Sequence, residues 1–532
     1  MRKWLPLIAV CLGTFMLLVD VTIVNVALPD MAASLSTSFS ALQWVIDIYA
    51  LVLAALLMAL GAVSDALGRR AVYLGGLGLF ALASLASGIA PNAAVLIAAR
   101  GVQGAGGAAM FATTIALLNS SYTGRDRGTA FGIWGAVAGG AAAAGPVIGG
   151  LLTEGLSWRW IFFVNLPVSI VAIVMTLRVI APDRSAKGLK LDLAGLVSFT
   201  AGAAAITLGL IRTSEDGWGS ASTIALLAVG VATLVVFAVV EGRVKNPLLE
   251  PALFRRPTFT GIMVVALLLN AAAFAYLAYS SLWLQTVVRL SPVRAGLLGS
   301  APLSLASFVV SALIGRFLHA TNPRWIIGGG MLLTGAGALL QATLGAHSSW
   351  PQLMAGLVVC GIGVGLATPT LVSNAMAAVP HARGGMAAGA VNTARQLGYA
   401  FGIAVLGSVF SARMTHVITS RGARATVAQA ISGGQARTLL AATPAAHRGG
   451  LDEIMHAATA SGLDACFLVA GVLGLVGGLI AVIMIRRPQA LPHGPERRPT
   501  ARHHAPQPQP QSGEGKGEEE QPSFEVASVP GE

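Results

Sequence analysis

The scarcity of charged side chains constrains this chain more than any other feature of its sequence. Asp, Glu, Lys and Arg make up 11% of its 532 residues, whereas they make up about 25% of an ordinary soluble domain. Hydrophobic residues make up 55% of the chain, and its mean hydropathy is +0.74. A soluble chain of this length would form several domains, each with a charged surface. The sequence therefore predicts an integral membrane protein.

Fourteen apolar stretches are long enough to cross about 30 Å of hydrocarbon as α-helices. The first begins after Met1-Arg2-Lys3, as a signal peptide does, but it continues through Asp20 to Pro29 without a small-residue cleavage site, so we interpret it as a span. We predict spans at 5–29, 44–64, 71–90, 94–119, 129–152, 158–181, 190–211, 220–240, 258–285, 294–318, 323–345, 350–377, 385–410 and 463–485.

The positive residues predict how these spans are oriented. With the N-terminus inside, 23 of the 34 Lys and Arg residues fall on the inner side and nine on the outer side, while Arg100 and Arg395 fall within spans. We therefore expect a multi-pass protein of the cell (cytoplasmic) membrane with both termini in the cytoplasm. The net charge of +12 follows the same alternation of loops, so it indicates a lipid bilayer and no nucleic acid as partner.

A weak internal repeat divides the chain. Arg127-Gly128 and Arg383-Gly384 lie 256 residues apart, and each pair opens a span rich in Gly and Ala. Two six-helix bundles with a site between them are typical of secondary transporters. We predict a bundle at 1–189, two linking spans at 190–257, a second bundle at 258–486 with an outer loop at 411–462, and a disordered cytoplasmic tail at 487–532.

Four motifs follow one another in the N-terminal half. The loop after the second span has the spacing G-x-x-x-D-x-x-G-R-R, in which a carboxylate beside Arg could latch neighbouring helix ends. In order along the chain, the motifs are Leu18-Val-Asp20-Val-Thr-Ile-Val-Asn25-Val-Ala-Leu-Pro29; Gly61-Ala-Val-Ser-Asp65-Ala-Leu-Gly68-Arg69-Arg70; Arg100-Gly-Val-Gln103-Gly-Ala-Gly-Gly107; and Gly145-Pro146-Val-Ile-Gly149-Gly150, followed by Trp158-Arg-Trp160-Ile-Phe-Phe-Val-Asn165-Leu-Pro167.

Together these motifs resemble the fourteen-span drug:proton antiporter family of the major facilitator superfamily, over about residues 5–485. The resemblance implies an all-α fold of two six-helix bundles plus two linking helices. It implies a gating loop at Gly61, Asp65, Gly68, Arg69 and Arg70, and an antiporter helix at Gly145, Pro146, Gly149 and Gly150 that shapes alternating access.

The C-terminal half departs from the family pattern. Its corresponding loop, Gly315-Arg316-Phe-Leu-His319, lacks the acid. Spans 294–318 and 385–410 contain no Asp or Glu, although some relatives that export cationic drugs carry an acid there. This departure weakens any prediction of divalent cations as substrates.

Charged residues within the spans are the strongest functional signal, because a charge at bilayer depth costs at least about 2.5–3.5 kcal/mol and normally faces a partner or a cavity. At 1.5 Å per residue, Asp20 lies roughly 22 Å from the inner end of its span, and Arg100 lies roughly 9 Å below the outer end of its own. The two therefore share a depth and could pair. We assign proton coupling to Asp20, Asp47 and Arg100, although Asp47 also fits a residue that snorkels at the outer rim.

Polar residues in the same spans are expected to line the substrate cavity. Arg395 near the middle of span 385–410 fits either a cavity position or a structural hydrogen-bonding role. The predicted cavity residues are Asn25, Gln103, Asn392, Arg395 and Gln396.

The resemblance implies a proton-coupled efflux antiporter that exports hydrophobic or amphipathic drugs or antibiotics and acts as a monomer, with a small-molecule drug and protons as partners. A dedicated metabolite exporter, or another transporter of this fold, stays open, since fold does not fix substrate. A membrane enzyme would need clustered catalytic groups, and a sensor would need a folded soluble domain.

No cofactor or metal site is expected. The spans contain no cluster of His, Cys and acids, and the chain has no nucleotide-binding P-loop. Cys11, Cys360 and Cys466 lie in apolar runs and are interpreted as packing residues. We interpret His503-His504 as part of a solvated tail and not as a metal site.

Overall fold

The computed structural model describes residues 2–37, 39–182, 192–244, 247–314, 322–345, 348–380, 383–422, 427, 440 and 443–486. Within these ranges the secondary structure is helical and contains no strand, which confirms the all-α class. Residues Met1–Pro488 form one compact unit. The predicted tail 487–532 and the C-half loop at Gly315, Arg316 and His319 lie outside the described residues.

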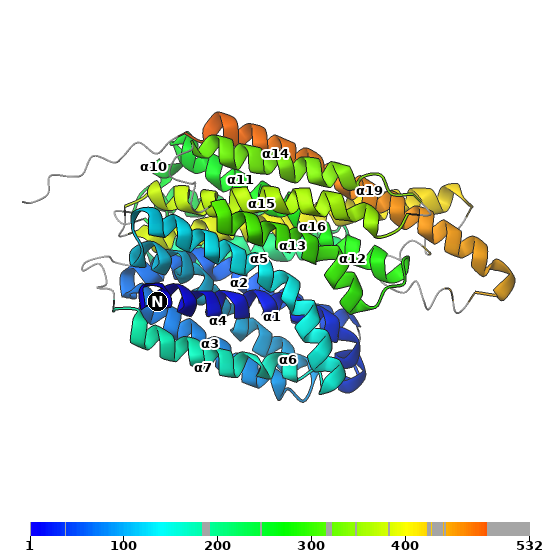
Figure 1. Cartoon of the computed structure of the whole chain (residues 1–532), viewed down its shortest axis with the longest axis horizontal. Coiled ribbons are helices and arrows are strands. Elements are labelled where there is room, and N and C mark those ends of the chain that lie inside the picture. The colour runs from blue at the N-terminus through cyan, green and yellow to red at the C-terminus, as the bar shows by residue number, and fades with distance from the viewer. Residues whose placement is uncertain are drawn as a thin grey trace, which may run out of the picture. The chain divides into compact units, whose positions relative to one another are not determined.

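The N-terminal helices form the lower group of ribbons in Figure 1. In this group α1 packs against α5 and α7, while α4 packs against α2 and α3. The helices are α1 (Leu5–Leu35, after the short 3-10 turn Arg2–Trp4), α2 (Phe39–Leu67), α3 (Arg69–Gly88), α4 (Ala93–Ser121), α5 (Gly124–Gly155), α6 (Trp160–Phe163) and α7 (Asn165–Val179).

The C-terminal helices form the upper group in Figure 1. Here α14 packs between α15 and α19, and α11 packs against α16 and α19. The helices are α11 (Pro257–Ala273, after the single turn α10 at Pro251–Phe254), α12 (Leu277–Thr286), α13 (Pro292–Ile314), α14 (Pro323–Gln341), α15 (Pro351–Ala377), α16 (Gly384–Ser420) and α19 (Ala445–Met484).

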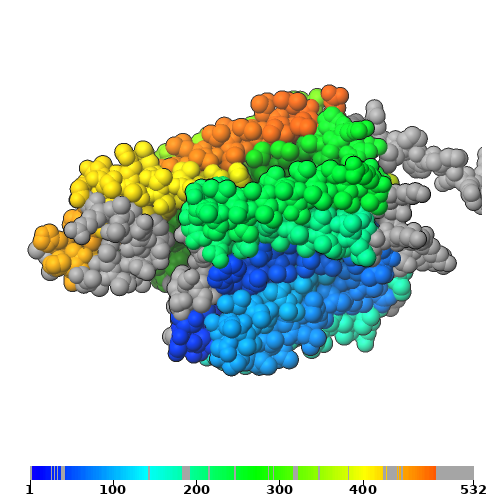
Figure 2. Space-filling model, turned by 180° about the vertical axis from the view of Figure 1, so that it is seen from behind, coloured from blue at the N-terminus to red at the C-terminus, as the bar shows by residue number. Residues whose placement is uncertain are grey.

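Two helices lie between these groups in sequence, α8 (Leu193–Asp216) and α9 (Ala221–Glu241). Helix α8 contacts α2 of the N-terminal group and α16 of the C-terminal group, and α9 packs on α8. Figure 2 shows this green pair across one face, between the blue and the orange helices. Only 17% of the most apolar window of α9 is buried within the protein, as expected for a helix that faces lipid.

The two groups meet through pairs of helices. The contacts run between α2 and α16, between α5 and α13, and between α4 and α16. These pairs include the second and fifth spans of the N-terminal half and carry the Gly-rich motifs of the sequence. The gating loop and the antiporter helix therefore both lie at the junction of the groups.

Each of the fourteen predicted stretches falls on helical structure, and two of them are interrupted. Span 158–181 breaks at Val164, between α6 and α7, and span 258–285 breaks between α11 and α12. In the part that the structure describes, twelve helices are long and apolar enough to cross a membrane, and α5 and α14 are not among them. The number fourteen therefore stays a prediction.

The helices also continue into the predicted outer loop 411–462. Helix α16 extends to Ser420 and α19 begins at Ala445. Hydropathy marks only the stretch that lies in hydrocarbon, whereas backbone hydrogen bonds carry a helix on past that stretch.

Candidate functional site

A buried polar cluster surrounds Asp20 within the N-terminal helices. Arg100 donates from Nη1 to Oδ2 of Asp20 at 2.5 Å. Gln103 and Asn165 both donate from their side-chain amides to Oδ1, each at 2.9 Å. Asp20 is 0% exposed and Arg100 is 1% exposed. All three neighbours donate to Asp20, and both of its carboxyl oxygens accept.

The guanidinium of Arg100 is held on its other sides as well. Its Nε donates to the carbonyl of Val45 at 3.0 Å, and Nη1 also donates to Oε1 of Gln103 at 2.8 Å. Its Cζ lies 4.2 Å from the centre of the Tyr49 ring, a distance at which the ring face attracts a cation. The sequence predicted the common depth of Asp20 and Arg100, and the structure brings the two side chains together.

The cluster joins four helices. Asp20 lies on α1, Arg100 and Gln103 lie on α4, Asn165 begins α7, and Ser84 of α3 accepts from Gln103 at 2.8 Å. A change of charge at Asp20 would therefore alter the packing of α1, α3, α4 and α7 at once. Gln103, which the sequence placed in the cavity, lies fully buried in this cluster.

Sequence reasoning did not assign Ser84, Asn165 or Tyr49 to the site. Ser84 and Tyr49 are single polar residues in apolar helices, and only the packing reveals what they face. The sequence did offer a signal for Asn165, because this residue belongs to the fourth motif.

Asp65 forms a second polar centre, between the two groups of helices. Its Oδ1 and Oδ2 accept from the backbone N–H groups of Gly385 and Met386, at 2.8 and 2.9 Å. Arg69 donates to Oδ1 at 3.2 Å. The first N–H groups of a helix lack partners within that helix and carry a partial positive charge. Asp65 of α2 therefore caps α16 and joins the two groups of helices at this end of the protein.

Glycine makes this contact geometrically possible. A Cβ on Gly61 would lie 2.4 Å from the carbonyl oxygen of Gly385, and a Cβ on Gly385 would lie 2.3 Å from the carbonyl oxygen of Gly61. Gly68 has a φ of 100°, so the turn into α3 uses a backbone region that suits glycine. Arg70 reaches across to α7 and donates to the carbonyl of Leu177 at 2.8 Å.

The glycines of α5 bring it against helices of both groups. A Cβ on Gly145 or Gly149 would collide with Thr22 or Ile23 of α1, at 1.8 and 2.9 Å, and one on Gly150 would lie 2.5 Å from Val293 of α13. Pro146 lies in α5 and Asn25 in α1, but their side chains are outside the described part of the structure.

The remaining predicted residues lie along α2 and α16. Asp47 is half-buried on α2, and Tyr399 of α16 lies within electrostatic reach of it. Asn392 is fully buried and donates to the carbonyl of Phe111 on α4 at 3.3 Å. Arg395 and Gln396 are partly exposed. Asp47 and Asn392 therefore lie at the junction between the two groups of helices, and Arg395 and Gln396 follow Asn392 on α16.

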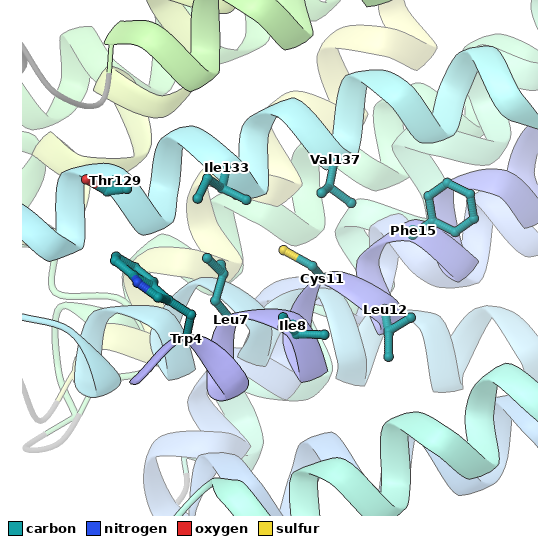
Figure 3. Close-up of a pocket in the computed structure, with 9 residues that line it drawn as sticks. All are labelled: Trp4, Leu7, Ile8, Cys11, Leu12, Phe15, Thr129, Ile133 and Val137. Atoms are coloured by element: carbon teal, nitrogen blue, oxygen red, sulfur yellow. The ribbon is translucent and has the colours of Figure 1, made fainter. Parts of the chain in front are cut away.

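An apolar groove of about 580 Å³ opens away from these centres, between α1 and α5. Figure 3 shows side chains of the two helices pointing toward each other around it. It follows the part of α1 that precedes Asp20 and does not include the cluster. The lining residues are Trp4, Leu7, Ile8, Cys11, Leu12, Phe15, Thr129, Ile133 and Val137.

Metal ligands do not gather in the described ranges: no three His, Cys, Asp or Glu side chains lie together there. Cys11, Cys360 and Cys466 are free and buried.

The sequence matches a known protein family and several curated relatives. The family model described as Major Facilitator Superfamily matches residues 10–403. The chain is 35% identical to the multidrug resistance protein Stp of Mycobacterium tuberculosis, covering 85% of this chain and 84% of that protein. It is 37% identical to the puromycin resistance protein pur8 of Streptomyces alboniger, covering 77% and 82%. It is 31% identical to the tetracenomycin C resistance and export protein of Streptomyces glaucescens, covering 94% of each.

Solved structures show the same fold at low identity. The human organic anion transporter MFSD10 (TETRAN) matches with a TM-score of 0.61 at 16% identity, covering 90% of this chain and 99% of that one. The peptide transporter POT matches with a TM-score of 0.55 at 14% identity, covering 90% and 93%. At these identities the likeness concerns the fold alone.

Proposed function

The chain belongs to the major facilitator superfamily, and from this premise we propose that it is a proton-coupled antiporter that exports hydrophobic or amphipathic drugs or antibiotics from the cell. The family makes it a multi-pass membrane transporter and not an enzyme. Relatives named for multidrug resistance, puromycin resistance and tetracenomycin C export support antibiotics as the substrate class. We infer that it acts as a monomer in the cytoplasmic membrane, with both termini inside.

The buried ion pair of Asp20 and Arg100 is the observation that carries proton coupling. A carboxylate that is 0% exposed and held by an Arg at 2.5 Å changes its whole environment when it takes up a proton. Burial of an unpaired charge is costly, so protonation of Asp20 leaves Arg100 in need of another partner. The pair therefore senses protons through the packing of four helices.

Asp65 supplies the other half of the mechanism, because it governs which end of the protein is open. Asp65 holds α2 against α16 at the end that the sequence assigns to the cytoplasm, and we infer that this contact belongs to the outward-facing state. We infer that Asp20, with Asp47 as a second candidate, is loaded with a proton in the outward-facing state once its buried cluster opens. After the change to the inward-facing state, drug binds and the proton is released.

Exchange of this kind requires that proton and drug favour different conformations. Helix α4 offers a link between the two centres, since it carries Arg100 of the cluster and also Phe111, whose carbonyl accepts from Asn392 of α16. A shift of α4 on protonation would therefore reach the junction of the two groups.

A dedicated metabolite exporter on the same fold is the second candidate. It would use the same proton site and the same closed end, and it would differ in the range of compounds that it carries.

The test is a susceptibility panel in a bacterial host that lacks its own drug pumps. Expression of the full chain is expected to raise resistance to several unrelated hydrophobic antibiotics, and a protonophore is expected to abolish the corresponding efflux. Resistance confined to one compound would favour the metabolite exporter. Efflux that persists with the protonophore would contradict proton coupling.

A further inference from the structure

Arg395 is a membrane-embedded cation that the mechanism above does not use. It lies on α16, roughly 16 Å from the start of that helix at 1.5 Å per residue, which is close to the middle of about 30 Å of hydrocarbon. Its Nε and Nη1 are enclosed and have no hydrogen-bond partner among the described residues. The side chain as a whole is partly exposed, so the guanidinium is not sealed off on every side.

The other arginine within a span is paired, and so is the arginine of the loop after α2. Arg100 binds Asp20 at 2.5 Å, and Arg69 binds Asp65 at 3.2 Å. For Arg395, no carboxylate of the described part of the chain lies within ion-pair distance. An intramembrane charge normally faces a partner or a cavity. Arg395 therefore has no ion-pair partner among the described residues, and its guanidinium is available to a transported compound.

The position of Arg395 fits a transported partner better than a lipid headgroup. Asn392, one turn earlier on α16, donates to the carbonyl of Phe111 on α4, so this stretch of α16 faces the N-terminal group. Headgroups lie at the bilayer surface, whereas Arg395 lies near its middle. A compound that passes between the two groups of helices would meet the guanidinium there.

We propose that Arg395 binds a carboxylate of the transported compound, so that the preferred substrates are hydrophobic organic acids. The planar fork of a guanidinium matches the two oxygens of a carboxylate. Spans 294–318 and 385–410 contain no acid to compete for it. This inference rests on the proposed export function and names its substrate class.

The experiment uses the full chain in proteoliposomes with a pH gradient, and two dyes that differ only at one group. Rhodamine 110 carries a free carboxylate, and rhodamine 123 is its methyl ester. The variants are Arg395→Gln and Arg395→Lys, with Arg289→Gln as the control. Arg289 forms an exposed ion pair with Asp452, so its substitution also removes one positive charge but away from the junction.

Arg395→Gln is expected to lower transport of the acid dye at least about tenfold, as for a lost hydrogen bond to a charged group, and transport of the ester by less than about twofold. Arg395→Lys is expected to retain part of the transport of the acid, and Arg289→Gln all of it. The same Arg395→Gln protein is expected to melt no lower than wild type, because it loses a charge that has no partner.

Three results would overturn the inference. The first is an equal fall in transport of both dyes. The second is a lower melting temperature of Arg395→Gln together with its rescue by Asp47→Asn, which would make Asp47 the partner in another conformation. The third is a wild-type protein that confers resistance in the susceptibility panel but does not transport the acid dye. A wild-type protein that confers no resistance at all would instead refute the proposed function itself.

Discussion

Asp20 lies where a change of one proton has large consequences, because its carboxylate is the only counter-charge that the described residues offer to the buried Arg100. An exposed acid exchanges its proton with water at little cost to its neighbours. Asp20 has no contact with solvent in this conformation. Its protonation therefore has to be coupled to a rearrangement that opens the cluster.

Replacement of Asp20 by Asn keeps the shape of the side chain and removes the exchangeable proton. Asp20→Asn is expected to abolish uptake driven by a pH gradient in everted vesicles, while drug-for-drug exchange in proteoliposomes persists. It leaves Arg100 unpaired, and loss of one member of a buried pair typically costs about 3–5 kcal/mol, so the melting temperature is expected to fall. The double variant Asp20→Asn/Arg100→Gln is expected to regain stability without regaining coupled transport.

Asp216→Asn is the matched control for this substitution. Asp216 forms an ion pair with Arg212 at 3.3 Å and is 35% exposed, so its loss is expected to leave coupled uptake intact. Gradient-driven uptake by Asp20→Asn at the wild-type rate would move the proton site elsewhere, with Asp47 as the next candidate.

At the scale of helices, the closed end depends on one carboxylate that caps a helix of the other group. Asp65 has two oxygens for two backbone N–H groups of α16. An amide offers one oxygen, carries no charge, and places a donor against the second N–H group. The α2–α16 contact is therefore expected to be weakened selectively, while the midplane of the protein stays unchanged.

Asp65→Asn is expected to cut efflux severely and to leave equilibrium drug binding within a few-fold. The direct measurement is a spin-label distance between Leu67→Cys and Pro380→Cys, two exposed positions on opposite sides of this contact. The distribution is expected to shift to longer distances in Asp65→Asn. Asp126→Asn, which breaks an exposed pair with Lys3, is expected to leave it unchanged. An unaltered distribution together with lost drug binding would contradict the latch.

Helix α5 provides a steric test of the same scale. A side chain at Gly149 would meet the carbonyl oxygen of Ile23 at 2.9 Å, whereas one at Gly155, later in the same helix, would meet nothing within 4 Å. Gly149→Leu is expected to trap one facing state and to stop efflux, at a typical overpacking cost of about 1–3 kcal/mol. Gly155→Leu is expected to transport normally. The trapped state is detected by the accessibility of introduced cysteines from both sides of the membrane. If Gly149→Leu keeps the accessibility of the wild type from both sides, it is not trapped in one state.

The helices themselves could be predicted from the sequence because hydrophobicity and length decide them. The prediction 350–377 corresponds to α15 at Pro351–Ala377, and 220–240 corresponds to α9 at Ala221–Glu241. The breaks at Val164 and between α11 and α12 were not predicted, since hydropathy averaged over a span does not register a single Asn or Pro within it. Asn165, directly after the first break, donates its amide to Asp20.

Only those site residues could be predicted that stand out in the sequence one by one. A charge within a span identifies Asp20, Arg100 and Arg395 without any structure. The partners of these charges depend on how helices face one another, so Ser84, Tyr49 and the burial of Gln103 required the packing. The cap of α16 by Asp65 joins residues 320 positions apart, which no local pattern encodes.

For the whole molecule, α8 and α9 raise the question of how often the chain crosses the membrane. They follow the first six predicted spans, and α8 contacts both α2 and α16. With the N-terminus inside, an outer turn between α8 and α9 returns the chain to the inner side before α11. The orientation of the C-terminal group is therefore the same whether or not α8 and α9 cross the membrane. The side on which the turn between α8 and α9 lies, in contrast, depends on whether they cross.

Labelling of single cysteines is expected to place that turn outside. The background replaces Cys11, Cys360 and Cys466 by Ala; all three are buried. Ala181→Cys, Gly219→Cys and Arg243→Cys are then introduced at exposed positions before α8, between α8 and α9, and after α9. A membrane-impermeant maleimide added to intact cells is expected to label only Gly219→Cys, where added atoms meet open space, and to label the other two after lysis. If Gly219→Cys is also protected until lysis, α8 and α9 do not cross the bilayer, and the chain has twelve spans around the same proton site.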